Sequence, residues 1–168
     1  MPKIIENLRE NLILEARRQV EASGYGILTV RSVAAACGVG VGTVYNYFPS
    51  KEALVAAFIL EDWQKCIDRI CAVSQESDTA GPVFACVHSQ LLQFTTLHRA
   101  VFADEAARTG FSGAQSPYHS LLRGQLAAPL EKFCPDPFTA EIIAEALLTW
   151  TLAGRSIENL EPLLNKLI

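Results

Sequence analysis

Residues 29–54 combine a short apolar helix signal, a glycine-rich turn and a second short helix that a proline ends. Thr29 is a helix N-cap residue, because its hydroxyl can accept a hydrogen bond from a first-turn amide. Gly38 suits the left-handed conformation that ends many helices, and Pro49 disfavours helix at the residue before it. The second helix therefore covers about 41–47. Two interpretations remain: a helix-turn-helix that lays one helix in the DNA major groove, or a structural corner between two helices.

Apolar residues recur at helical spacing along the whole chain, and no stretch alternates as a strand does. Hydrophobic residues make up 50% of the sequence, enough for a sizeable core. No apolar run reaches the roughly 18 residues that a membrane span needs, and no signal-peptide pattern opens the sequence. We therefore expect an all-α, cytoplasmic protein without membrane contacts.

The residues from 138 to 154 form a predicted helix that is apolar on nearly every side. One side can take the core, and the other needs a partner, most economically the same helix of a second copy. We therefore expect a homodimer. The other predicted helices are 3–23, 50–74, 82–98, 99–108 and 117–133, the last kinked at Pro129.

Charge and composition exclude several classes of protein. Residues 1–52 have a net charge of +1 and the rest −5, which argues against a nonspecific coat on nucleic acid. The five cysteines form no C-x-x-C pair, so we expect reduced thiols that pack as small apolar side chains, with a thiol sensor as the alternative. The histidines do not cluster with acids or cysteines, so we expect no metal. Without a phosphate loop, a nucleophile elbow or an acid–histidine constellation, we expect no cofactor and no enzyme activity.

The order of residues in the central stretch favours one of its two interpretations. A glycine-containing turn, then G-T-V-Y-N-Y-F and then P-S-K-E-A-L, resembles the signature of the tetracycline-repressor (TetR) family of transcription factors. The resemblance covers about the first third of the chain. It implies a DNA-binding head over 1–52 and a helical body over 53–168 that binds an effector and dimerises. Matching residues in the first helix and its exit are Ile13, Leu14, Ala16, Val20, Gly24 and Tyr25.

Carried over by position, the resemblance implies phosphate contacts from Thr29, Arg31 and Lys51. Hydroxyls and lysine suit phosphate, and Asn46 can read an adenine edge. For Tyr45 the alternative is a partly buried ring that packs on the first helix. The recognition-helix region implied by the resemblance comprises Val41, Gly42, Thr43, Tyr45, Asn46 and Tyr47.

Two positions depart from the family pattern. Gly40 stands where the family usually has a capping serine, so the recognition helix is expected to be less well capped. Val41 replaces a polar or basic residue and offers only an apolar contact, for example to a thymine methyl group. We therefore expect sparse direct readout of bases, and the sequence does not give the operator.

The resulting hypothesis is a homodimeric regulator, most economically a repressor, that a small apolar effector releases from a pseudo-palindromic double-stranded DNA operator. The alternative is a regulator controlled by a protein partner, or one without any small effector. Each pocket candidate can equally be ordinary core or dimer packing. The residues proposed to line the effector pocket are Trp63, Phe84, His88, Phe94, Phe102, Tyr118 and Trp150.

Overall fold

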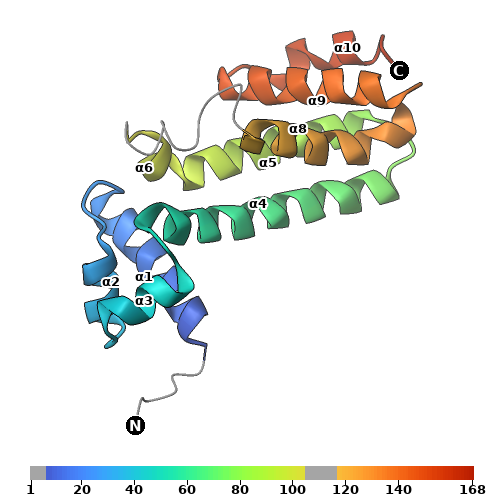
Figure 1. The fold of residues 1–168 in the computed structure, drawn as a ribbon. Coiled ribbons are helices and arrows are strands. Elements are labelled where there is room, and N and C mark those ends of the chain that lie inside the picture. Colours follow the sequence, from blue (N-terminus) through green and yellow to red (C-terminus); the bar gives the residue numbers. More distant parts are fainter. Residues whose placement is uncertain (1–6, 105–116) are drawn as a thin grey trace. The chain divides into compact units, whose positions relative to one another are not determined.

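The computed structural model describes residues 7–104 and 117–168, with side chains in the second segment described from Leu121 onward (Figure 1). Within these ranges every regular element is a helix, so the all-α prediction is confirmed. None of the described helices is both long enough and apolar enough to cross a bilayer.

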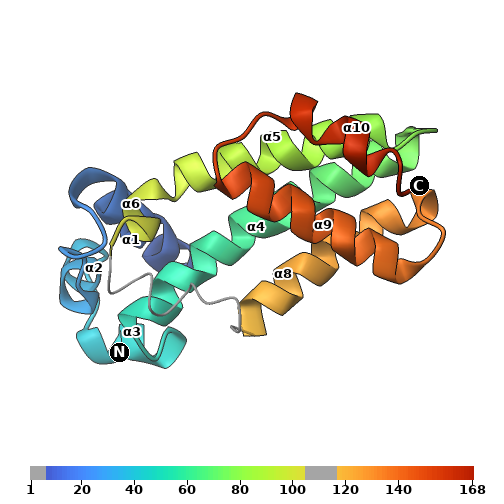
Figure 2. The same ribbon diagram turned by 90° about the horizontal axis from the view of Figure 1, so that it is seen from above.

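The chain divides into two compact units. Among the described residues, 7–62 with 98–104 form the first unit, and 63–97 with 117–168 form the second. The long helix α4 (Lys51–Glu76) begins in the first unit and continues into the second (Figure 2). The functional division expected between residues 52 and 53 stays a prediction.

In the first unit, local caps set the ends of the short helices. Thr29 Oγ1 accepts a hydrogen bond from the amide of Ser32 at 3.0 Å and starts α2 (Val30–Ala36). Gly38 follows that helix with a φ of 68°, a conformation that costs glycine little. α3 (Val41–Tyr47) begins without a side-chain cap at Gly40, as the missing serine led us to expect.

Two predicted helix ends in the first unit are wrong. α1 (Leu8–Ser23) does not begin at residue 3, because Asn7 has a left-handed φ of 57° and precedes the helix. α6 (Arg99–Phe102) is a single turn that ends before Ala103, whereas the prediction continued to residue 108; residues 105–108 lie outside the described part of the chain.

The second unit is a layered helical bundle. α9 (Pro137–Leu152) packs against α5 (Gly81–Leu97) and α8 (Pro117–Ala127), which lie beside it in both ribbon views (Figures 1 and 2). The expected kink at Pro129 is a change of helix type, from α8 to the 3-10 helix η1 (Ala128–Phe133). The chain ends with η2 (Ile157–Asn159) and α10 (Glu161–Leu164).

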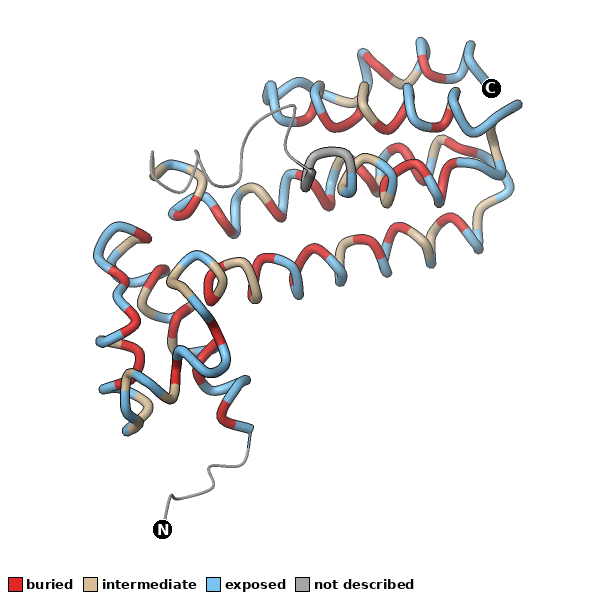
Figure 3. The backbone as a smooth tube through the Cα atoms, in the orientation of Figure 1, coloured by how far each residue is buried: buried red, intermediate tan, exposed pale blue. Residues whose placement is uncertain are grey.

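The outer face of α9 is only partly covered. Ile143, Leu147 and Leu148 are buried, whereas Ile142 is 47% exposed and Leu152 58% exposed. Buried and exposed stretches alternate along this helix (Figure 3). The helix therefore has one buried apolar side and one exposed apolar side, and cover of the exposed side by a second copy stays a prediction.

Candidate nucleic-acid interface

Helix α3 presents its polar and aromatic side chains to solvent. Val44 is fully buried, and Phe48, just beyond the helix, is 4% exposed, so these two residues fix the helix on the core. Tyr45 and Tyr47 are 50% and 47% exposed, and Asn46 is exposed. The alternative for Tyr45 is a partly buried ring that packs on the first helix. At 50% exposure, about half of Tyr45 remains accessible to a ligand.

A groove lies beside α3, and we call it the helix-turn-helix groove. It brings together five of the nine sequence-predicted contact residues, from α2, α3 and the start of α4, whereas Gly42, Thr43, Asn46 and Tyr47 do not line it. The groove is lined by Gly26, Leu28, Thr29, Val30, Arg31, Val41, Tyr45, Pro49, Ser50, Lys51 and Glu52.

The cations that line this groove differ from the others nearby. Between residues 7 and 62, Arg9, Arg17 and Arg18 each pair with a described carboxylate. Arg31 and Lys51 have no described carboxylate within 4.0 Å, and both line the groove. Two cations that form no ion pair with a described carboxylate therefore line the groove together with one acid, Glu52, and a phosphate could bind there.

Arg18 shows what a neutralised cation looks like in this unit. Its guanidinium donates two hydrogen bonds to Glu15, at 2.8 and 2.6 Å. The same bonds lower the pKa of Glu15 to about 2, with a further contribution from the amide of Gln19.

The hydroxyl of Thr29 has two uses. Its oxygen already accepts the capping hydrogen bond from the Ser32 amide, at 3.0 Å. Its own proton remains able to donate to a phosphate oxygen, as a hydroxyl is both donor and acceptor. Ser32 is in turn fixed by a hydrogen bond of 2.6 Å to Gln19 on α1.

The contact prediction did not include Tyr25 or Glu52, which form a hydrogen bond with each other near the groove. Tyr25 is 3% exposed, its hydroxyl donates to Glu52 Oε1 at 3.2 Å, and Lys51 Nζ lies 4.0 Å from the centre of its ring. Burial, followed by the negative charge of Glu52, raises the pKa of Tyr25 to about 12. The exit turn Gly24-Tyr25-Gly26 was visible in the sequence, but its contact with α4 was not.

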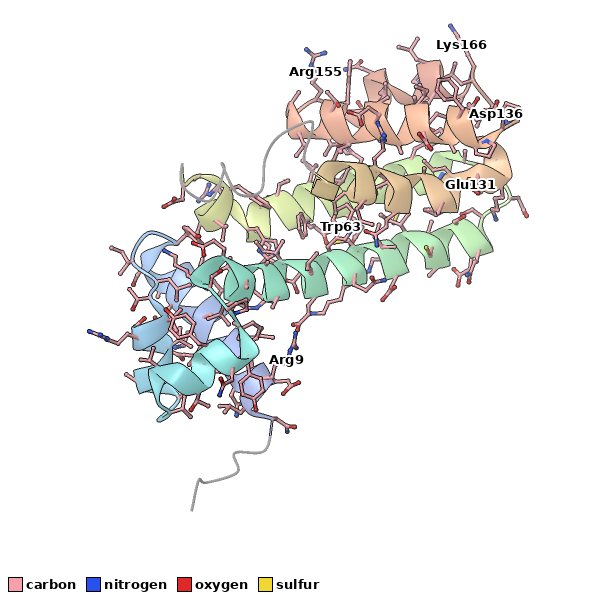
Figure 4. The ribbon with its side chains drawn as sticks, viewed as in Figure 1. Arg9, Trp63, Glu131, Asp136, Arg155 and Lys166 are labelled. Carbon is pink, nitrogen blue, oxygen red and sulfur yellow. The ribbon has the colours of Figure 1, made fainter. Side chains whose placement is uncertain are left out.

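In the second unit, several of the expected pocket residues belong to a packed aromatic core. Trp63 and Phe94 meet edge to face with ring centres 5.3 Å apart, and Phe84 is 1% exposed. Trp63 projects from α4 toward α8 (Figure 4), where its indole donates to Gln125 Oε1 at 2.7 Å. These contacts bring Trp63 and Phe94 together, and the polar end of Trp63 is satisfied within the protein.

Two other pocket candidates, His88 and Trp150, make polar contacts with different partners. His88 Nδ1 is 2.8 Å from the hydroxyl of Thr151 on α9. The indole of Trp150 donates to the carbonyl of Ser156 at 2.8 Å, and the Arg155 guanidinium lies 4.6 Å from the centre of its ring. Phe102 belongs to the first unit, and Tyr118 lies outside the described side chains.

A buried ionic cluster in the first unit was not predicted. Arg17 on α1 donates to Asp62 Oδ2, and His98 Nε2 lies 3.2 Å from the same oxygen. Asp62 is 7% and His98 2% exposed, and the histidine stacks on Phe58 with ring centres 5.8 Å apart. Burial, aided by the charge of Arg17 and opposed by that of Asp62, lowers the pKa of His98 to about 4.

Residues 12–58 match the family model described as bacterial regulatory proteins, tetR family. This segment contains the whole helix-turn-helix and all nine predicted contact residues. Among curated proteins, the chain is 34% identical over 58 residues to the HTH-type transcriptional regulator UidR of Escherichia coli K12, a match that covers 34% of this chain and 30% of UidR. The chain therefore matches less than a third of the length of that relative.

Solved structures resemble nearly the whole chain. The TetR family repressor AlkX of Dietzia sp. strain DQ12-45-1b superposes with a TM-score of 0.59 and 17% identity, over 87% of this chain and 84% of AlkX. The superantigen PfiT has a TM-score of 0.60 and 23% identity, over 96% of each chain. At these identities the likeness shows a shared fold.

Proposed function

We propose that this chain, which belongs to the tetR family of bacterial regulatory proteins through residues 12–58, is a cytoplasmic transcriptional regulator that binds double-stranded DNA with α3. The observation that carries the proposal is the helix-turn-helix groove, where Arg31 and Lys51 stand without described carboxylate partners beside the exposed face of α3. Phosphate contacts of this kind position a protein on the duplex, and side chains that enter a groove of the DNA select the base sequence.

The side chains of α3 favour a DNA site in which the protein contacts only a few bases directly. Asn46 is exposed and can bond an adenine edge, whereas Val41 offers an apolar contact that suits a thymine methyl group. With few base contacts in each half-site, specificity depends on two half-sites that a dimer holds at a fixed spacing.

Selection of bound duplexes from a random DNA library tests this function directly. We expect the purified protein to enrich one inverted repeat with an A·T pair at a fixed place in each half-site. Failure to enrich any sequence, at low salt and with the protein folded, would contradict the proposal.

Arg31→Ala and Lys51→Ala should each weaken binding to every duplex, by about three- to tenfold at low salt. Each should also reduce the slope of log affinity against log salt by about 0.9, because one phosphate contact is lost. Arg18→Ala is the matched control, because this cation is already held by Glu15 and its loss should leave the slope unchanged. A salt titration of affinity for one duplex measures all three, and an unchanged slope for Lys51→Ala would remove that residue from the interface.

We further propose a homodimer that joins through α9. Ile142 and Leu152 are exposed apolar residues on its outer face, and Phe138 at its start is 70% exposed. A second copy placed about a two-fold axis would cover the same residues on both chains. The indole of Trp150, on the same helix, donates a hydrogen bond to the carbonyl of Ser156, so Ile142 is the better probe of this face.

Ile142→Glu should split the dimer, since burying two carboxylates against an apolar partner without counter-ions is strongly unfavourable. Leu92→Glu on α5 is a matched control, as Leu92 is exposed to a similar degree, 41% against 47% for Ile142. Sedimentation velocity across a range of concentrations should show a monomer for Ile142→Glu and a dimer for the control. A dimeric Ile142→Glu protein would place the seam elsewhere.

Repression released by a small apolar effector is the finer part of the proposal. It is supported by the match of residues 12–58 to the tetR family. The pocket candidates Trp63, Phe84 and Phe94 are packed as core in the second unit, so an effector has to open that core to bind there. A ligand releases DNA only if it prefers the conformation that binds DNA poorly. Thermal-shift screening with apolar compounds, followed by release of the selected duplex, tests it. Stabilisation without release would favour control by a protein partner or no effector control.

A further inference from the structure

We propose that Tyr25 is the positioning residue for the phosphate contact of Lys51: its buried ring holds the ammonium group at the groove as an unneutralised cation. The inference rests on the proposed DNA binding and adds a residue that does not itself touch DNA. Tyr25 is 3% exposed, so its ring acts through Lys51.

The two ends of Tyr25 contact groups of opposite charge. Lys51 Nζ lies 4.0 Å from the ring centre, within the range of a cation–π interaction, while the hydroxyl donates to Glu52 Oε1 at 3.2 Å. Lys51 and Glu52 are neighbours in sequence, yet they are not within ion-pair distance of each other. The tyrosine therefore binds the carboxylate at one end and the ammonium at the other.

Glu52 is also committed to the start of α4. Its own backbone amide and the Ser50 hydroxyl hydrogen-bond to its carboxylate. These contacts, with smaller contributions from the Tyr25 hydroxyl and the charge of Lys51, lower the pKa of Glu52. Ser50 Oγ in turn accepts from the amide of Ala53 at 3.1 Å. An acid held in this cap compensates the helix N-terminus, and it attracts Lys51 only from beyond ion-pair distance, so a phosphate can make the direct contact.

The ring of Tyr25 stabilises the ammonium group of Lys51 at a position that is otherwise unfavourable. A lysine in the first turn of a helix is repelled by the helix dipole, and its long side chain has many rotamers to lose when it binds. Attraction to a ring face offsets the repulsion and fixes the side chain before DNA arrives, without cancelling its charge as a carboxylate would. Arg18, which Glu15 holds, shows the neutralised alternative in the same unit.

A double-mutant cycle on affinity for a random-sequence DNA duplex at low salt tests the inference. Tyr25→Leu removes the ring and should weaken binding about three- to fivefold, with a smaller salt slope. Tyr25→Phe keeps the ring and should bind DNA like the wild type. In the Lys51→Ala background, Tyr25→Leu should have no further effect, because there is no ammonium left to position.

The outcomes separate this inference from the proposed function. If the folded wild type binds no DNA, the function fails. A different result would overturn only the positioning role: the wild type binds DNA, Lys51→Ala weakens binding, and Tyr25→Leu causes the same loss of affinity with or without Lys51. The two losses of binding free energy would then be additive, as expected for a structural defect that does not act through Lys51. Circular dichroism confirms that each variant is folded.

A second measurement on the unmodified chain covers the case in which Tyr25→Leu does not fold. The ε-methylene protons of Lys51, assigned by comparison with Lys51→Arg, should resonate upfield of those of other lysines, because they lie over an aromatic face. A Lys51 signal at the ordinary lysine position in the folded, DNA-free protein would overturn the inference.

Discussion

Replacing Asp62 by asparagine is expected to lower the free energy of unfolding by about 3–5 kcal/mol. Arg17 donates to the Asp62 carboxylate inside the first unit, where the arginine side chain is only 21% exposed and that of Asp62 9%. Asparagine keeps the shape but removes the charge, so the guanidinium is left without its counter-ion in a largely dry site. Chemical denaturation at neutral pH measures the loss.

Glu61→Gln is the matched control, one residue earlier on the same helix. Glu61 pairs with Arg9 at 3.6 Å, with both side chains more than 40% exposed, so its loss should change the unfolding free energy by less than about 0.5 kcal/mol. Replacing both buried partners, as Arg17→Met with Asp62→Leu, should recover most of the stability lost by Asp62→Asn. Equal losses of unfolding free energy for Asp62→Asn and Glu61→Gln would mean that the buried ion pair stabilises the fold no more than the exposed one.

The caps and breakers of the helix-turn-helix could be predicted from sequence because they act over short distances. Thr29, Gly38 and Pro49 each set a helix end through their own backbone preferences or a bond three residues away. Within the helix that these residues delimit, Val44 is buried and Asn46 is exposed. Local chemistry was sufficient there.

Helix ends without such markers were predicted less well. The apolar pattern suggested a helix up to residue 108, but α6 stops at Phe102. At the other end, Asn7 adopts a left-handed conformation that asparagine tolerates better than most residues, and α1 begins after it. Periodicity predicts that a segment can be helical, but it does not fix where the chain must turn.

The buried Arg17–Asp62–His98 cluster was missed because its members are 45 and 36 residues apart. A signal was present: Arg17 lies four residues after Ile13 and three before Val20, on the buried stripe of α1. His98 likewise follows buried Phe94 by four residues. A charge on an apolar stripe calls for a buried partner, and the sequence does not say which one. The contact of Tyr25 with Lys51 and Glu52 is another such pairing across the fold.

The free energy of unfolding should fall as the pH is lowered from about 7.5 to 5, by about 1–2 kcal/mol, through His98. Its folded-state pKa of about 4 lies below the ordinary value of 6.5, so the unfolded chain binds the proton more tightly. The contribution of His98 to the free energy of unfolding is therefore fully present above pH 6.5 and is lost as the pH falls toward 4. Glu15, with a pKa lowered to about 2, contributes only below its ordinary pKa of 4.5, outside this window.

His98→Gln should remove most of this fall, because glutamine can still donate to Asp62 but does not titrate. The variant is expected to be less stable at neutral pH, since it loses the stacking on Phe58, yet its stability should be nearly constant between pH 7.5 and 5. His88→Gln leaves His98 in place and should keep the wild-type slope, which makes it the matched control. Urea denaturation at several pH values separates the two variants. A slope that survives in His98→Gln would show that the acid sensitivity of the fold comes from another group.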